Sequence, residues 1–321
     1  MKKFKFAIMG AGGISNQFCD AVSRLENCEI IAVASKSLER ARIFAERNHI
    51  NTAYGSYREM LEEERPDCVY TGVLPNSHYE LSMLCLDYNI PVLCEKAMFM
   101  NSRQAEEVFK RSREQNVFVM EALWSRFLPA VKKAKSWVEE GRIGKPQLCD
   151  TAIGFIAPEG KDNRYYNVDL GGGAARDILV YAFELTTYML TDPIEDIQVS
   201  VIWGETGVDL TDHVMLHFHD AVASLTTSFA APIEERMVIY GTEGKIILPN
   251  PHFAGEVFLY NKDKKQIEYF KDEQTENGFT YEIQETVKCI LAGETESCIV
   301  PQKSTLDCAR LFDMIEESRR Q

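Results

Sequence analysis

The sequence has little that would point to a membrane, to nucleic acid or to an oxidising compartment. No apolar run approaches the length of a membrane span, and Lys5 and the glycines that follow interrupt the first apolar segment before it could form a signal-peptide core. Acidic residues outnumber basic ones by 49 to 35, and the formal charge of −14 would repel nucleic acid and anionic lipid. We therefore expect a cytoplasmic protein that binds neither nucleic acid nor a membrane.

Paired cysteines, repeats and low-complexity linkers are also missing. The nine cysteines are odd in number and form no C-x-x-C pair, so we expect reduced and mostly buried thiols. The chain of 321 residues, of which 45% are hydrophobic and 26% charged, is long enough for two domains with separate cores. Composition thus indicates an ordinary globular protein.

A glycine-rich turn near the start is the most informative feature present. The apolar run Ala7–Met9 breaks into the sequence GAGGIS at 10–15, which predicts a strand, a tight turn and a helix. Gly10 lets the chain reverse, Gly12 lets the backbone approach a pyrophosphate, and the helix N-terminus attracts its negative charge. Ser15 stands where Gly or Ala is usual. The predicted dinucleotide contacts in this turn are Gly10, Gly12, Gly13 and Ile14.

The residues after the second predicted strand, Glu29–Ala34, indicate which dinucleotide binds. A site for NAD usually has an acid there, about 20 residues beyond the glycines. This chain has instead Ser35, Lys36 and Ser37, followed by Arg40. Because the lysine and the two hydroxyls can contact a 2′-phosphate, the sequence favours NADP over NAD. Two alternatives remain open: the serines bind the ribose hydroxyls of NAD, or the cations belong to an ordinary solvated helix start.

Alternating strands and helices continue beyond this unit. We expect a helix at Tyr54–Glu64, a strand at Cys68–Val73, a helix at Tyr79–Tyr88 and a strand at Pro91–Cys94. Leu74–His78 forms a proline turn with a polar cap, in which we interpret the histidine as a cap or surface residue rather than a catalyst. The predicted cofactor contacts of this turn are Leu74, Pro75, Asn76 and His78.

Glu95 and Lys96 directly follow the last of these strands. Open parallel sheets bind ligands beyond the carboxyl ends of their strands, so a lysine there faces the cofactor crevice. We therefore predict that Glu95 and Lys96 contact the cofactor and that Lys96 is catalytic.

From about Trp124 the alternation ends. A basic amphipathic helix at Val131–Glu139 and a glycine-rich turn precede a series of short β-rich segments, which predicts an α+β domain with a largely antiparallel sheet. These segments are Gln198–Trp203, Val214–Phe218, Ala223–Phe229 and Met237–Gly241. The predicted fold is thus an α/β Rossmann dinucleotide-binding domain over 1–123, followed by an α+β substrate-binding and dimerisation domain with a largely antiparallel open sheet over 124–321.

A second glycine cluster introduces the candidate chemistry. The triplet Gly171–Gly173 begins a predicted helix in which Asp177 and Tyr181 stand four residues apart, and this spacing puts both on one face. A hydride-transfer dehydrogenase needs a group that takes the hydroxyl proton. Tyrosine alone has a reference pKa of about 10, and the ammonium of Lys96 would lower it. We expect Tyr181 as acid/base, Lys96 as its electrostatic partner and Asp177 as an orienting group; packing or a surface pair is the alternative.

Several motifs in the same order resemble one enzyme family. They are GAGGIS at Gly10, the segments Leu74–Lys96, Met120–Ala130 and Leu170–Tyr181, and the F-x-Y-E-I pattern at Phe279–Ile283. Together they resemble the glucose-fructose oxidoreductase, inositol dehydrogenase and MocA family. Within it they resemble most the branch of dimeric dihydrodiol dehydrogenases and NADP-dependent xylose dehydrogenases. The resemblance covers nearly the whole chain and implies similar roles for Lys96, Asp177 and Tyr181.

Two positions depart from the family pattern. Ala97 stands where the family usually has proline after Glu-Lys, which frees a backbone N–H. Tyr181 stands where much of the family has histidine, although tyrosine is what the dihydrodiol and xylose branch resembles. The resemblance also implies a substrate wall at Trp124, with core packing as the alternative. The predicted substrate contacts are Trp124, Arg126, Phe155, Asp177 and Phe279.

Three histidines, His213, His217 and His219, share strand parity with Met215. They could bind zinc, but the opposite face already supplies the core, so we expect no metal and a face directed to solvent or a partner subunit. Such an amphipathic sheet face favours a homodimer, as the resemblance also implies, and Phe279 could then reach the partner's pocket.

The sequence as a whole predicts an oxidoreductase that transfers hydride between NADP, with NAD possible, and a hydroxyl of a sugar, polyol or cyclic diol. Two alternatives remain: an NAD-linked polyol dehydrogenase, and a non-catalytic dinucleotide sensor or scaffold.

Overall fold

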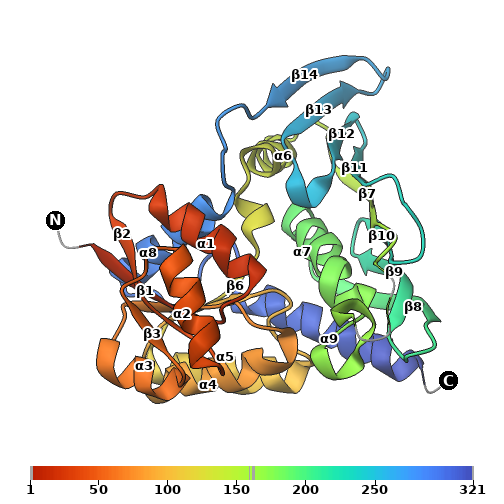
Figure 1. The fold of residues 1–321 in the computed structure, drawn as a ribbon. Coiled ribbons are helices and arrows are strands. Elements are labelled where there is room, and N and C mark those ends of the chain that lie inside the picture. Colours follow the sequence, from red (N-terminus) through yellow and green to blue (C-terminus); the bar gives the residue numbers. More distant parts are fainter. Residues whose placement is uncertain (1–2, 159, 161–162, 320–321) are drawn as a thin grey trace. The chain divides into compact units, whose positions relative to one another are not determined.

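The computed structural model describes residues 3–158, 160 and 163–319, which form two compact units (Figure 1). The first unit contains the described residues up to Trp124 together with Glu276–Leu306, and the second contains Ser125–Thr275 and the residues from Asp307. The chain thus returns to the first unit near its end. We expected one domain to end at residue 123 and the next to begin at residue 124. That these are separately folding domains stays a prediction.

The first unit is built on a parallel sheet of six strands in the order β3-β2-β1-β4-β5-β6. The order reverses between β1 and β4, so the carboxyl ends of these two strands form the place where such sheets bind ligands. The strands are β1 (Phe4–Met9), β2 (Cys28–Ala34), β3 (Thr52–Tyr54), β4 (Cys68–Thr71), β5 (Val92–Glu95) and β6 (Val119–Ala122). The predicted Rossmann architecture is confirmed.

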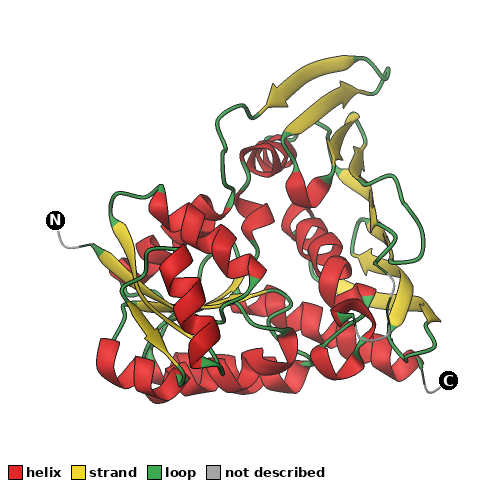
Figure 2. Cartoon of the chain, in the orientation of Figure 1, coloured by secondary structure: helices red, strands yellow, loops and turns green. Residues whose placement is uncertain are grey.

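Helices surround this sheet (Figure 2). Polar caps start three of them: the side chains of Ser37, Ser56 and Asn101 each accept a hydrogen bond from a backbone N–H in the first turn. The helices are α1 (Gly13–Ser23), α2 (Leu38–Arg47), α3 (Tyr57–Glu64), α4 (His78–Asp87), α5 (Ser102–Gln115) and α8 (Phe279–Ala292).

One predicted element of this unit needs correction. We expected a helix over Tyr54–Glu64, but the structure forms β3 up to Tyr54 and begins α3 only at Tyr57. A three-residue edge strand is too short to produce a periodic signal, and it exists because β2 pairs with it. Ser56 then caps the helix.

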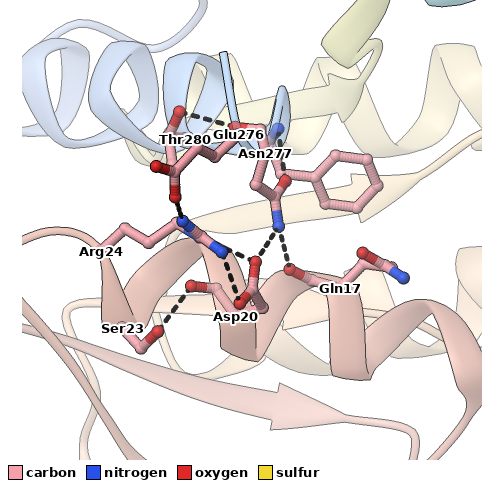
Figure 3. Close-up of polar contacts among 8 residues, drawn as sticks. Gln17, Asp20, Ser23, Arg24, Glu276, Asn277 and Thr280 are labelled. Atoms are coloured by element: carbon pink, nitrogen blue, oxygen red, sulfur yellow. Dashed lines mark hydrogen bonds and ion pairs between the residues drawn. The ribbon is translucent and has the colours of Figure 1, made fainter. Parts of the chain in front are cut away.

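The returning segment holds α8 against α1, as Figure 3 shows. Asn277 donates its amide to the carbonyl oxygen of Gln17 at 3.0 Å and to Oδ2 of Asp20 at 2.7 Å. Arg24 forms an ion pair with Glu276 and another with Asp20. The helix that follows the glycine turn is therefore braced by a segment more than 250 residues away in the sequence.

The second unit is built on an eight-stranded sheet in the order β14-β13-β12-β11-β7-β10-β9-β8. All neighbours are antiparallel except β7 and β10, which are parallel. The strands are β7 (Pro146–Gly154), β8 (Ile194–Trp203), β9 (Asp209–Phe218), β10 (Val222–Ser228), β11 (Arg236–Gly241), β12 (Gly244–Pro249), β13 (Glu256–Asn261) and β14 (Gln266–Lys271). The predicted, largely antiparallel sheet is confirmed.

Helices lie along one side of this sheet (Figure 2). Helix α6 (Pro129–Glu139) packs on β12 to β14, and α7 (Val180–Met189) packs on β7 and β10. The residues of α9 (Gln302–Ser318) from Asp307 on also belong to this unit. No described helix is long and apolar enough to cross a membrane.

The alternation expected for β9 is present. Val214, Leu216 and Phe218 are buried, whereas His213 and Met215 on the opposite face are exposed. The imidazole Nδ1 of His213 lies 3.0 Å from Oγ1 of Thr226, and that of His219 lies 3.2 Å from a carboxylate oxygen of Glu195. Among the described residues no group of three or more possible ligands is placed to hold a metal ion.

Candidate active site

The glycine turn after β1 packs tightly against the end of β4, and no space is left for a side chain at Gly10. Gly10 has a φ of +112°, and a Cβ there would lie 2.8 Å from the carbonyl carbon of Gly72, at the end of β4. Only glycine fits this position. Ser15, in the unusual third position, is buried and donates its hydroxyl to the carbonyl oxygen of Gly10 at 2.6 Å. Its hydroxyl thus locks the turn that the sequence pattern predicted.

The N-terminus of α1 is available to an anion. Gly12 occupies the N-cap position without a side-chain hydrogen bond, and the first turn carries no acidic side chain. Gly13 and Ile14 are exposed. Unsatisfied N–H groups at a helix start favour phosphate, so this end fits the pyrophosphate of a dinucleotide.

At the end of β2 the polar residues divide into two kinds. Ser35 is buried and Ser37 caps α2, accepting a hydrogen bond from Arg40 N at 3.3 Å, so both hydroxyls already bond the local backbone. Lys36 and Arg40 are exposed. The nearest acid along the chain, Glu39, is exposed in the first turn of α2. The two cations, rather than the serines, form the feature here that suits a phosphate.

Tyr57 belongs to this corner and was missed by sequence reasoning. Burial raises the pKa of Tyr57. A hydrogen bond from the backbone N–H of Lys36 and the nearby charge of Arg40 act in the opposite direction and lower it in part. Tyr57 opens α3, 21 positions after the lysine in the sequence, so no local motif connects them. Its half-buried ring supplies a wall beside the two cations.

His78 differs from the surface or cap residue that we expected. Its ring is fully buried, with Nδ1 3.0 Å from the carbonyl oxygen of Ala97 and Nε2 3.0 Å from that of Val73. Burial lowers its pKa to about 4, so the imidazole is neutral near neutral pH. The expectation was wrong because α4 packs this side chain inward. His78 therefore joins the loop after β4 to the loop after β5.

The neighbouring cofactor candidates precede this histidine. Leu74 is the N-cap of a short 3-10 helix, Pro75–Ser77, and Asn76 is exposed on it. The proline occupies the first helical position, where a missing N–H has no cost.

The loop that carries Lys96 is held from two sides. The peptide bond between Lys96 and Ala97 is cis. His78 contacts the carbonyl oxygen of Ala97, and the backbone N–H of Met98 donates to Oε1 of Glu121 at 2.8 Å. Side chains from α4 and β6 thus fix the backbone directly after Lys96, where the family pattern would have a proline ring.

The first unit buries the carboxyls of Glu95, which precedes this lysine, and of Glu282. Glu95 accepts a hydrogen bond from the phenol of Tyr70 at 2.6 Å, and burial raises its pKa. Glu282, on α8, is fully buried, and neither of its carboxyl oxygens has a hydrogen-bond partner among the described residues. Burial, and then the charge of Glu95, raises the pKa of Glu282 well above its usual range. The F-x-Y-E-I pattern contains this buried acid but does not explain its burial.

The aromatic candidates fall into separate clusters. In the first unit Trp124 and Phe279 are both buried and their ring centroids lie 5.5 Å apart. In the second unit Phe155 packs against Phe229 at 5.3 Å and against Tyr165 at 5.8 Å. Each predicted wall residue thus packs on other aromatic rings of its own unit.

Arg126 is placed differently from a substrate-binding residue. Its guanidinium is buried and lies 2.6 Å from a carboxylate oxygen of Glu184, which is also buried. It also donates from Nε to the backbone carbonyl of Glu184 at 2.9 Å. These contacts inside the second unit indicate a structural role, and the substrate role is withdrawn.

The segment with Asp177 and Tyr181 starts as a π-turn, Ala175–Leu179, and becomes regular in α7. Asp177 lies 3.1 Å from a guanidinium nitrogen of Arg164, whose cation stacks over the ring of Tyr165 at 4.1 Å. Tyr181 is buried, and its ring centroid lies 5.1 Å from that of His252. We expected a regular helix, whereas the structure widens its first turn.

The second glycine cluster explains how Arg164 reaches Asp177. A Cβ on Gly172 would lie 2.7 to 2.8 Å from the carbonyl oxygens of Arg164, Tyr165 and Asn167. The backbone N–H of Gly173 donates to the carbonyl oxygen of Tyr165 at 3.0 Å. The glycines therefore let the preceding loop pack directly on the helix start. Sequence reasoning found the triplet but missed Arg164, because the contact depends on that packing.

Comparison with known proteins finds two matching family models and full-length relatives. Residues 4–123 match a family model described as the oxidoreductase family with an NAD-binding Rossmann fold, and residues 131–247 match one described as the GFO/IDH/MocA C-terminal domain. The chain is 33% identical, over 99% of its length and 96% of the relative's, to a trans-1,2-dihydrobenzene-1,2-diol dehydrogenase of Danio rerio.

Solved structures share the fold across the whole chain. The 3-ketoreductase KijD10 of Actinomadura kijaniata, in complex with NADP and TDP-benzene, has a TM-score of 0.84 and 22% identity, covering 97% of this chain and 96% of its own. A levoglucosan dehydrogenase in complex with NADH and levoglucosan has a TM-score of 0.90 and 18% identity, covering 99% and 97%.

Proposed function

The chain belongs to the GFO/IDH/MocA oxidoreductase family and is a dinucleotide-dependent dehydrogenase acting on CH–OH groups, and we propose that it prefers NADP and acts on a sugar, polyol or cyclic diol. One observation carries the cofactor preference: Lys36 and Arg40 are exposed beside Tyr57 at the end of β2. A 2′-phosphate would gain charge-assisted hydrogen bonds there. The glycine turn and the start of α1 would hold the pyrophosphate.

We propose distinct roles for three side chains in the reaction. Tyr181 exchanges a proton with the substrate hydroxyl, and the ammonium of Lys96 favours its ionised form. Asp177, already paired with Arg164, orients the substrate or the lysine. The nicotinamide, when bound, supplies the hydride acceptor or donor. His78 and Glu121 fix the backbone of the loop directly after Lys96, and Glu95 precedes the lysine at the end of β5.

The proposed substrate class rests on the kinds of side chain among the predicted substrate contacts. Trp124, Phe155 and Phe279 offer apolar ring faces, and Asp177 with Arg164 offers polar contacts for neighbouring hydroxyls. Rings that carry adjacent hydroxyls, such as sugars and cyclic diols, present both kinds of surface. The name of the Danio rerio relative, a dehydrogenase of a dihydrobenzenediol, agrees with this class.

A substrate screen tests the proposal. Sugars, polyols and cyclic diols are each offered with NADP and with NAD, and reduced cofactor is followed by its absorbance. Turnover with NADP at lower cofactor concentration than with NAD supports it. Faster turnover with NAD on polyols would favour an NAD-linked polyol dehydrogenase. Cofactor binding without turnover on the whole panel would favour a sensor or scaffold.

We also propose that the protein forms a homodimer through the uncovered face of the second sheet and is cytoplasmic. Met215, Val222 and Tyr240 are 37%, 37% and 38% exposed on strands β9, β10 and β11. Helices α6 and α7 pack on this sheet, and an uncovered apolar face favours pairing with a second copy. The nine cysteines are free thiols, all buried except Cys298, which suits a reducing compartment.

A further inference from the structure

Two buried aspartates of β9 lie beneath the segment that carries the proposed catalytic residues. Asp209 and Asp212 are 1% and 0% exposed. Oδ2 of Asp209 accepts a hydrogen bond from the backbone N–H of Ala175 at 2.5 Å. Ala175 opens the π-turn that contains Asp177, four residues before Tyr181. Asp209 therefore satisfies an N–H at the start of this helix from outside the helix itself.

The close approach of Asp209 depends on the glycine triplet. Gly173 has a φ of +112°, and a Cβ there would collide with Oδ1 of Asp209. The sequence thus keeps this position without a side chain at the point where the carboxyl passes toward Ala175 N. A glycine at position 173 is thus required for Asp209 to reach the backbone N–H of Ala175.

The second carboxyl must carry a proton. Oδ2 of Asp212 accepts a hydrogen bond from the hydroxyl of Thr227 at 3.2 Å, whereas Oδ1 has no hydrogen-bond partner among the described residues. The carboxyl of Asp209 lies close enough for its charge to act on Asp212. Two neighbouring buried carboxylates repel each other, which favours the neutral form of one of them. Asp212 holds this proton, because its Oδ1 has no partner among the described residues and Asp209 already accepts from Ala175 N.

The charged side chains around Asp209 and Asp212 favour one negative charge, rather than two, on this pair of carboxyls. The nearby cation is Arg176, on the π-turn, which also pairs with Glu316 of α9 at 3.2 Å. Thr227 faces the pair from β10. Burial, and then the charge of Asp209, raises the pKa of Asp212 well above its usual range. One cation shared with a third carboxylate does not balance two buried anions.

We propose that Asp209 is a positioning residue for the helix of Asp177 and Tyr181, and that Asp212 maintains it by keeping the pair singly charged. Its kinetic consequence rests on the proposed function. A carboxylate at Asp209 fixes the helix start through Ala175 N. Loss of the proton from Asp212 would place two repelling charges under that start.

Thermal unfolding against pH tests the charge state without any substrate. In the wild type Asp212 is protonated when folded and ionised when unfolded, so the wild type loses stability as pH rises above the unfolded pKa of about 4. Asp212→Asn can still donate to Asp209 but does not titrate. Its Tm should exceed that of the wild type by a margin that grows by roughly 2 °C or more per pH unit between pH 5 and 8. Asp263→Asn, in the exposed β13–β14 turn, is the control. A constant margin would overturn the proposal.

Kinetics test the positioning role. Asp209→Ala should lower kcat by at least about 10-fold with cofactor affinity unchanged, because the cofactor candidates belong to the first unit. Asp209→Asn, whose amide oxygen can still accept from Ala175 N, should recover most of this loss. A folded Asp209→Ala enzyme with wild-type kcat contradicts the proposal. If Asp209→Ala does not fold, the pH dependence of Asp212→Asn decides. A wild type without turnover refutes the proposed function alone.

Discussion

Nδ1 of His78 lies 3.0 Å from the carbonyl oxygen of Ala97, the residue that follows Lys96. The other ring nitrogen lies 3.0 Å from the carbonyl oxygen of Val73. A neutral imidazole has one N–H, so it donates to one of these carbonyls at a time. His78 thus connects two loops of the cofactor-binding edge from behind, and its protonation would place a charge in a fully buried position.

This burial predicts a pH dependence of stability. The pKa of His78 is about 4 when folded, below its unfolded value of about 6.5, so the unfolded state binds more protons between these values. Stability from this group is therefore complete above pH 6.5 and falls by up to about 3 kcal/mol as pH drops to 4. Denaturant titrations at pH 7.5 and pH 5 measure the free energy of unfolding at each pH. His78→Gln should remove the part of the loss between these pH values that comes from the histidine. His49→Gln is the control, and equal slopes for wild type and His78→Gln would contradict the prediction.

Cofactor choice should depend on Lys36. Lys36→Ala removes an exposed cation next to the proposed 2′-phosphate position, so NADP affinity should fall by about 1 to 3 kcal/mol while NAD affinity barely changes. Equilibrium binding of both cofactors measures the difference. Arg47→Ala, at the far end of α2, removes the same charge away from the site and should change neither affinity. Equal losses for NADP and NAD in Lys36→Ala would refute the assignment.

The chemical step should depend on Tyr181. Tyr181→Phe keeps the ring that packs beside His252 but cannot exchange a proton, so kcat should fall by roughly 10² to 10⁴ with cofactor affinity retained. Lys96→Met should also disable turnover. Tyr188→Phe, on the same helix, provides the matched control. Near-normal kcat in Tyr181→Phe would remove this tyrosine from the mechanism.

Arg126 should matter for stability rather than for substrate binding. Arg126→Ala leaves the buried carboxylate of Glu184 without its cation and should cost about 3 to 5 kcal/mol of unfolding free energy. The double variant Arg126→Met with Glu184→Gln removes both charges and should recover part of this loss. A stable Arg126→Ala enzyme with a raised KM for substrate would restore the role first expected from the sequence.

The uncovered sheet face should control assembly. Met215→Arg puts a charge in the centre of the proposed dimer contact, so light scattering should fall from twice 36.5 kDa to one chain mass. Ile43→Arg changes another apolar residue, 60% exposed on α2, and should leave the mass unaltered. A wild type that is monomeric and fully active at micromolar concentration rules out a required dimer.

The sequence by itself determined the order of elements around the cofactor edge. The strand, glycine turn and helix at the start depend on residues that are adjacent in the sequence. Gly10 has a backbone conformation that favours glycine, and the free N–H groups at the start of the next helix favour a phosphate. The alternation of β9 likewise follows from side chains that point to opposite faces of a strand. Local rules were sufficient for such features.

Only the tertiary structure decided which polar side chains are buried and what they contact. His78 was expected at the surface and Arg126 in a pocket wall, yet the ring nitrogens of His78 lie 3.0 Å from two carbonyl oxygens inside the first unit, and Arg126 pairs with Glu184 inside the second. Asp209 meets Ala175 across 34 positions of the chain. No periodic pattern predicts these contacts, because the partner of a buried polar group is whichever distant segment the packing brings within hydrogen-bond distance.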